Sequence, residues 1–142
     1  AALGRKLAKM SAAAHAVAPR RETPGAGVMA GLGAQLSLAF TSSPDIFRPA
    51  ETLEFHALYE SALRQLKDLL NTRADKGLVR RCHGDMHSGN IIVEDGEPKL
   101  FDAIEFSEKI ATIDVLYDLA FLLMDLWSHD QQPAANVVFN HY

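Results

Sequence analysis

The stretch HGDMHSGNIIVEDGEPKLFD, residues 83–102, decides the expected fold of this chain of 142 residues. Its first eight residues comprise two glycines and five polar residues, which predicts a tight loop outside the core. Two short runs with strand character then flank the pair Asp95-Gly96, the typical signal of a two-residue β-hairpin turn. The sequence therefore predicts a polar loop that leads directly into a hairpin over Ile91–Phe101.

The length of the turn fixes which residues of the hairpin face one another. Continued pairing from a two-residue turn puts Asn90 opposite Phe101, with Asp102 diagonally adjacent to Asn90. Asp85 lies on the loop that enters the same end of the hairpin. Three oxygen-bearing side chains are therefore expected to converge at the open end of the hairpin.

This set of side chains suits a hard cation. Mg²⁺ prefers oxygen ligands, is commonly held by one or two carboxylates, and completes its shell with water and substrate phosphates. The spacing H-x-D-x-x-x-x-N, followed by a hairpin and a further Asp, is also the arrangement that phosphoryl transfer requires. There, one Asp accepts the proton of the attacking hydroxyl, while an Asn and a second Asp hold the metal ions.

The stretches HGDMHSGNIIV, LFDAIEF and IDVLYDLAFLLMDL resemble the aminoglycoside phosphotransferase and choline kinase family, whose fold is similar to that of protein kinases. All fixed positions of that family's loop motif, H-G-D-x-H-x-x-N, are present, although Ala103 and Ile104 stand where protein kinases continue Asp-Phe-Gly. The resemblance implies an ATP- and Mg²⁺-dependent phosphotransferase acting on a hydroxyl of a small molecule. It makes Asp85 the catalytic base and makes Asn90 and Asp102 the metal ligands.

Further roles surround this loop. In kinase-like folds the helix that corresponds to residues 115–127 offers an Asp to backbone N–H groups of the catalytic loop, and the resemblance assigns this role to Asp118. For Asp125 a solvated position at the helix edge is favoured. His83 and His87 are interpreted as structural residues of the loop. Glu105 either contacts a cationic substrate or faces solvent.

A metallohydrolase is the competing enzyme class, because His83 and His87 bracket Asp85 as H-x-D-x-H. Such a site needs further His or Asp ligands. The other histidines lack motif spacing, and Asn90 would have no role. This class is therefore disfavoured, and the histidines left outside any motif are His15, His56, His129 and His141.

The remaining sequence predicts a mostly helical α+β fold, a single partial domain over residues 1–142 that resembles the C-terminal lobe of a kinase. Leu3, Leu7, Met10, Ala14 and Val17 form the apolar stripe of a first helix. Residues 19–50, rich in glycine, proline and serine, predict an irregular linker. A long helix with one buried face follows, with its apolar stripe running from Phe55 to Leu70 and its end near Gly77. A core helix, Val115–Trp127, is capped by Asp114 and carries Trp127 and the Leu119–Met124 run as core.

The net charge of −4 conceals an acidic block. Residues 83–130 hold eleven acidic residues against two lysines and carry −9, which suits a divalent metal and a cationic substrate. A pI of about 5.8 argues against a nucleic-acid partner. The apolar runs are too short to span a membrane. The single cysteine, Cys82, is interpreted as a small buried residue in a cytoplasmic protein.

Kinase-type catalysis also needs a Gly-rich loop over the phosphates and a strand-borne Lys. Neither motif is present, and the glycines of residues 25–33 have the wrong order and context for one. The N-terminal lobe is therefore expected from a longer parent protein or from another chain, and the isolated 142 residues are expected to be inactive. In a similar bacterial subgroup a P-loop domain follows. The alternative is a non-catalytic binding or regulatory module that keeps the kinase-like C-lobe.

Overall fold

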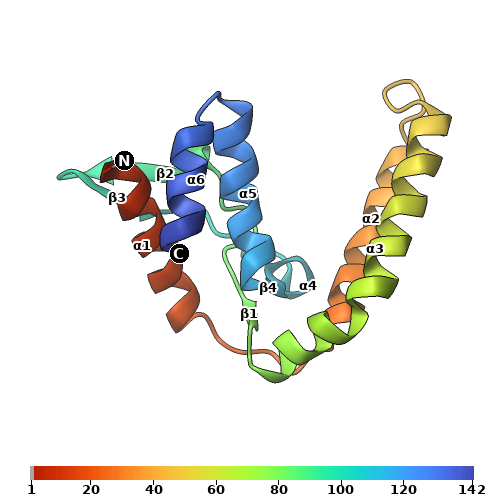
Figure 1. Cartoon of the computed structure of the whole chain (residues 1–142), viewed down its shortest axis with the longest axis horizontal. Helices are drawn as coiled ribbons and strands as arrows, with labels where there is room; N and C mark the ends of the chain where they lie inside the picture. Colours follow the sequence, from red (N-terminus) through yellow and green to blue (C-terminus); the bar gives the residue numbers. More distant parts are fainter. Residues whose placement is uncertain (1) are drawn as a thin grey trace. The chain divides into compact units, whose positions relative to one another are not determined.

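The computed structural model describes residues 2–142, which form two compact units (Figure 1). One unit comprises residues 2–21 and 78–142, and the other comprises residues 22–77. The fold is mostly helical α+β, as the sequence predicted. It has two small antiparallel sheets, of which the sequence predicted only the hairpin. No helix within the described residues is long and apolar enough to cross a membrane.

Three helices build the core of the first unit. Helix α6 (Gln132–His141) packs against both α1 (Ala2–Val17) and α5 (Val115–Ser128) (Figure 1). Complete burial of one Leu side chain is worth about 1.5–3 kcal/mol, so this cluster supplies much of the unit's stability. Its buried members are Leu7, Ala8, Met86, Leu119, Leu122, Leu126, Ala135 and Val138.

Helix α1 forms where the apolar periodicity predicted it, but a different face is buried. Leu3 and Val17, the ends of the expected stripe, are 52% and 83% exposed. The buried face instead runs through smaller and polar residues, because α6 approaches α1 closely. A Cβ added to Gly4 would lie 2.8 Å from Cγ1 of Val137. The buried residues of α1 are Gly4, Leu7, Ala8, Ser11 and His15.

The hairpin has the predicted register. Strand β2 (Ile91–Glu94) pairs with β3 (Glu97–Leu100), and beyond the strands the Phe101 N–H donates to the Asn90 carbonyl at 3.1 Å. Asp95 and Gly96 have φ values of 52° and 75°, the left-handed conformations that a two-residue hairpin turn requires. The Asp-Gly pair therefore fixed the register correctly.

The second sheet lies at the base of helix α5. Strand β1 (Val79–Arg81) pairs antiparallel with β4 (Thr112–Asp114), which follows the short helix α4 (Glu108–Ala111). Asp114 ends β4 and caps α5, accepting a hydrogen bond from the Leu116 N–H at 2.8 Å, as predicted. The expectation that Trp127 and Met124 belong to the core was wrong, since they are 63% and 62% exposed on the face of α5 opposite the buried stripe.

The second unit is a helical hairpin of α2 (Gly25–Thr41) and α3 (Pro49–Asp75) (Figure 1). The prediction of an irregular linker over residues 19–50 was therefore wrong for Gly25–Thr41, while residues 19–24 and 42–48 do lie outside helices. Two of the four glycines of α2 serve close packing: a Cβ on Gly25 would lie 2.2 Å from the Leu70 carbonyl oxygen, and one on Gly33 would lie 2.3 Å from the Tyr59 ring. Glycine is unfavourable within a helix but permits this approach.

Helix α3 forms as predicted, but its apolar stripe is not buried among the described residues. No residue of α3 is buried, and Leu58 and Leu69 are 65% and 57% exposed. Aromatic contacts to α2 exist at one end, where the rings of Phe40 and Phe55 pack edge to face with centroids 5.3 Å apart. The expected buried face of this helix is therefore only partly covered by α2.

Replacing Asp114 tests the cap of α5. Asp114→Ala should lower the free energy of unfolding by about 1 kcal/mol or more, because the Leu116 N–H loses its acceptor in a half-buried position. Asp114→Asn keeps an acceptor of equal quality and serves as the matched control. Urea unfolding measures both variants, and equal losses for Ala and Asn would contradict a capping role.

Candidate active site

The loop over residues 83–90 alternates between the core and solvent. Its entry is tied to the end of α4, just before β4, since the Cys82 N–H donates to the Ala111 carbonyl at 2.8 Å. Met86 is fully buried in the core cluster, with its sulfur 3.4 Å from the Ser11 hydroxyl. The expectation that the whole loop lies outside the core was therefore wrong. Asp85, beside this anchor, has a side chain 45% exposed.

Asp118 of α5 holds the start of the loop. Its side chain is fully buried, with Oδ1 accepting from the Gly84 N–H at 2.9 Å and Oδ2 from the His83 N–H at 3.1 Å. A buried carboxylate is costly unless hydrogen bonds compensate for its lost hydration. These are the contacts with loop N–H groups that the sequence suggested for Asp118, and they fix the backbone immediately before Asp85.

Asp125, two turns further along α5, holds the end of the loop. Its Oδ2 accepts from the Ser88 N–H at 2.8 Å, and its side chain is only 15% exposed, so the expected solvated position was wrong. Burial raises the pKa of Asp125, but hydrogen bonds from Ser88 and the nearby His129 and His87 outweigh it and lower the pKa below its ordinary value. One helix face thus binds both ends of the loop.

Asp85 is oriented by two neighbours on its own loop. The Asn90 amide nitrogen donates to the Asp85 carbonyl at 3.0 Å and to Oδ2 at 3.3 Å. His87 accepts from the Gly89 N–H through Nδ1, so its Nε2 carries the hydrogen that faces Asp85 Oδ2 at 3.4 Å. Both side-chain contacts reach Oδ2, and within residues 2–142 Oδ1 of Asp85 has no hydrogen-bond partner. That oxygen is the one left for an incoming group.

His83 ties the loop to the segment that contains Asp102. Its Nε2 hydrogen-bonds the Phe101 carbonyl at 2.8 Å, and its own carbonyl accepts from the Ile104 N–H at 2.9 Å. Asp102 lies between these two anchors with a φ of 58°, a conformation uncommon for residues other than glycine. Its side chain is exposed. These anchors hold the backbone on both sides of Asp102 at the open end of the hairpin, where the Phe101 N–H donates to the Asn90 carbonyl. The convergence of the Asp102 and Asn90 side chains stays a prediction.

Glu105 lies beyond these anchors, on a segment whose backbone and neighbouring Glu108 are hydrogen-bonded by arginine side chains. Arg81 donates to the Ile104 carbonyl at 3.3 Å and to Glu108 at 2.5 Å, and Arg21 contacts the same carboxylate at 3.1 Å. These hydrogen bonds lower the pKa of Glu108 below its ordinary value. Glu105 itself is exposed and points to no partner within the described residues.

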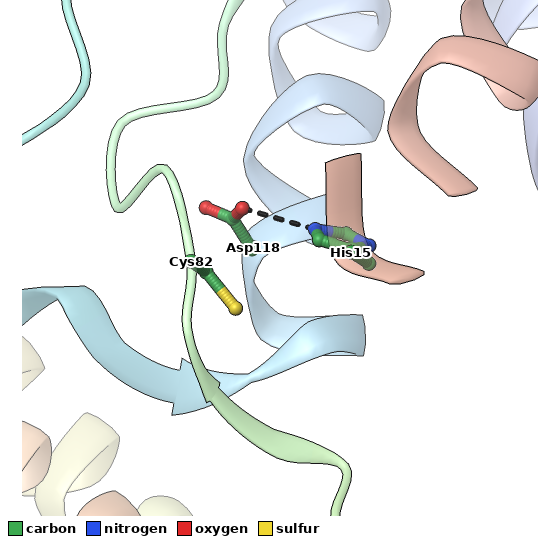
Figure 2. Close-up of side chains that lie close together, drawn as sticks. All are labelled: His15, Cys82 and Asp118. Atoms are coloured by element: carbon green, nitrogen blue, oxygen red, sulfur yellow. Dashed lines mark hydrogen bonds and ion pairs between the residues drawn. The ribbon is translucent and has the colours of Figure 1, made fainter. Parts of the chain in front are cut away.

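A residue that the sequence interpretation left without a role joins this site from α1. His15 is buried, and its Nε2 lies 3.0 Å from Asp118 Oδ2, as Figure 2 shows. No sequence motif links His15 to Asp118, because 103 positions separate the two residues. The signal lay in a different helical stripe, since Leu7, Ser11 and His15 recur at intervals of four.

Cys82 completes a buried group with His15 and Asp118 whose donor atoms lie within 4.8 Å of one another (Figure 2). This group has the residue types of a metal site, but its hydrogen bonds argue against one. Both oxygens of Asp118 already accept from the loop, and burial followed by the Asp118 and Asp114 carboxylates raises the pKa of Cys82 to about 12. Cys82 is a buried residue, as predicted.

Asn90 and Asp102 have the donor chemistry that Mg²⁺ requires. Both hydrogen bonds of the Asn90 side chain are made by its amide nitrogen, so within residues 2–142 the amide oxygen has no hydrogen-bond partner. The Asp102 carboxylate is exposed, on the residue that follows Phe101, the hairpin partner of Asn90. An amide oxygen and a carboxylate, both hard oxygen ligands, fit this ion better than zinc.

Comparison with known proteins identifies the family. A model of the phosphotransferase enzyme family (APH) matches residues 1–142, and the chain belongs to this family. Uncharacterized proteins of Mycobacterium bovis and of two Mycobacterium tuberculosis strains are 39% identical over 54 residues. That segment is 38% of this chain but only 11% of each relative, so the match spans a small part of much longer proteins. No solved structure matches the chain significantly.

The lowered pKa of Asp125 predicts a pH-dependent contribution to stability. A carboxyl whose pKa is lowered by folding stabilises the protein above its ordinary pKa of 3.8, and this stabilisation is lost as the pH falls through the lowered value. Asp125→Asn should therefore reduce the free energy of unfolding by about 1–3 kcal/mol above about pH 5, and the difference from wild type should shrink below pH 3.8.

Urea unfolding at a series of pH values measures this difference. Asp130→Asn is the matched control, because Asp130 is exposed just beyond α5 and Asn tolerates its φ of 57°. A difference for Asp125→Asn that does not change between pH 6 and pH 3 would contradict the role of its charge at Ser88.

Proposed function

We propose that this chain carries the catalytic-loop half of an ATP- and Mg²⁺-dependent phosphotransferase that acts on a hydroxyl of a small molecule. Membership of the phosphotransferase family supports the reaction class. One observation carries the assignment to this site: Asp85 is held through Oδ2 on a loop bound at both ends by α5, while Oδ1 has no partner within residues 2–142. This is the arrangement expected of a positioned base.

Asp85 orients the substrate hydroxyl and accepts its proton as the oxygen attacks the γ-phosphorus of ATP. The bond from this phosphorus to the β,γ-bridging oxygen breaks, and ADP leaves. The Asn90 and His87 contacts keep the carboxylate from rotating, so the accepting oxygen does not need to be reoriented for each turnover. Phosphoryl transfer needs little covalent chemistry from the protein, and positioning of this kind supplies much of its catalysis.

Asn90 and Asp102 are the residues that would hold Mg²⁺, through the amide oxygen and the exposed carboxylate. When bound, the ion neutralises charge on the β- and γ-phosphates. His83 serves this pair by binding the Phe101 carbonyl, which keeps the residue before Asp102 next to the loop. The proposed ligands therefore depend on the same backbone anchors as Asp85.

The acidic block favours a cationic substrate. Residues 83–130 carry −9, and Glu105 is exposed on the segment that follows Asp102. Because the Arg81 contacts hold the backbone of this segment, Glu105 can meet a substrate amine without first ordering a loop. Such a field also repels ATP. We therefore propose that an N-terminal lobe, in the same or another polypeptide, supplies the Gly-rich loop and the basic groups that bind it.

The experiment is phosphate transfer from ATP by the full-length gene product over a panel of aminoglycosides, neutral sugars and amino alcohols. Asp85→Asn and Asp102→Asn should each lower kcat by about 10²–10⁴-fold, because the first removes the base and the second a charged metal ligand. Product formation followed by mass spectrometry measures the transfer, and cationic compounds should be turned over with higher kcat/KM than neutral ones.

Asp95→Asn is the matched control, since it makes the same substitution in the exposed hairpin turn, where Asn also adopts a positive φ. This variant should transfer phosphate at the wild-type rate. Retained turnover in both Asp85→Asn and Asp102→Asn would reject the site assignment. Absence of transfer to every compound would favour the non-catalytic binding module.

A further inference from the structure

We infer that His15 of α1 is a positioning residue for the catalytic loop, acting through Asp118; this inference rests on the proposed phosphotransferase activity. His15 belongs to no motif and lies far from the loop in sequence. In space its ring sits between two partners. Nε2 contacts Asp118 Oδ2 at 3.0 Å, and Nδ1 contacts the Tyr142 hydroxyl at 2.7 Å.

The Asp118 carboxylate is the point where α1, α5 and the loop meet (Figure 2). Because a carboxylate only accepts hydrogen bonds, the Nε2 of His15 is the donor in their contact. Oδ2 is shared between His15 and the His83 N–H, while Oδ1 is occupied by the Gly84 N–H. The imidazole therefore fixes the rotation of the carboxylate about its last bond, and with it the direction of both loop hydrogen bonds.

Because the contact between His15 and Asp118 is buried, a water molecule cannot take the place of the His15 donor. The side chains of His15 and Asp118 are 5% and 0% exposed, so a lost His15 would leave Oδ2 short of one donor in a dry environment. The carboxylate would then turn or shift to recover it, and the backbone of His83 and Gly84 would follow. Asp85 is the next residue. Even a 1 Å displacement of a catalytic group costs about 10²-fold in rate.

The ring of His15 is itself held firmly enough to act in this way. Tyr142 packs edge to face on it with centroids 5.5 Å apart, and Arg80 donates to the His15 carbonyl at 2.7 Å. One turn earlier on α1, Ser11 contacts Met86, the buried anchor of the same loop. Helix α1 thus contacts the loop region through Ser11 and His15. Of these two residues, only His15 reaches the Asp118 carboxylate that binds the loop backbone.

Two amide substitutions of His15 distinguish a role in positioning the Asp118 carboxylate from a role in packing alone. In His15→Gln the amide nitrogen can reach the place of Nε2 and donate to Asp118. In His15→Asn the amide is one methylene shorter and reaches the side of Nδ1 and Tyr142 instead. His141→Asn is the control, because His141 is exposed and bonds the Val137 carbonyl of its own helix. All variants are made in the full-length gene product.

Steady-state phosphate transfer and amide hydrogen exchange at Gly84 are measured for each variant. We expect His15→Asn to lower kcat by about 10²-fold and to speed Gly84 exchange, with KM for ATP changed less than about twofold. His15→Gln should recover most of both losses. Equal behaviour of Gln and Asn, or wild-type kcat and exchange in His15→Asn, would overturn the inference.

The two readouts also separate this inference from the proposed function. If the wild-type protein transfers no phosphate to any compound, the proposed function fails, and Gly84 exchange alone decides the role of His15. Faster exchange in His15→Asn than in His15→Gln would then still support positioning of the loop by His15. Equal exchange in these two variants would overturn it.

Discussion

The buried carboxylate of Asp118 is the constraint on which this structure depends. A charged group without exposure is tolerated only when hydrogen bonds replace its hydration, and here His83, Gly84 and His15 supply them. These hydrogen bonds constrain the geometry. The N–H groups of His83 and Gly84 must both point at α5, and α1 must place His15 next to the same carboxylate. The position of Asp85 follows from satisfying this one charge.

Two further residues of α5 fix the loop, Leu122 one turn and Asp125 two turns after Asp118. Asp125 binds Ser88 at the far end of the loop, and between the two carboxylates the helix contributes Leu122 to the cluster that buries Met86. Polar anchors at both ends and an apolar anchor in the middle fix the backbone around Asp85, whose side chain is half-exposed beside the buried Met86. The apparent contradiction of acidic residues on an apolar core helix is thereby explained.

Local chemistry made much of this site predictable from the sequence. The Asp95-Gly96 turn fixes the hairpin register through backbone conformation alone, and Asp114 marks the start of α5 through its cap. These features involve neighbours in sequence. Asn90 and Asp102 were brought to one end of the hairpin by the same local rule, although their proposed metal-binding role stays a prediction.

Features that depend on distant neighbours could not be predicted. Gly25 and Gly33 indicate a loop until α3 is known to pass within reach of their missing side chains. The buried face of α1 shifted to small residues because α6 approaches Gly4 closely. His15 and Asp125 found partners 103 and 37 positions away. In each case the deciding contact lies outside any sequence window.

In the proposed site, Asn90 and Asp102 bind the metal–nucleotide complex beside Asp85. Titration of the full-length protein with Mn²⁺ and ATP, followed by paramagnetic broadening of backbone amide signals, tests this directly. The amides of residues 85–90 and 101–103 should broaden first, and Asp102→Asn should abolish the effect. Broadening centred on residues 15, 82 and 118, or none in the presence of nucleotide, would contradict it.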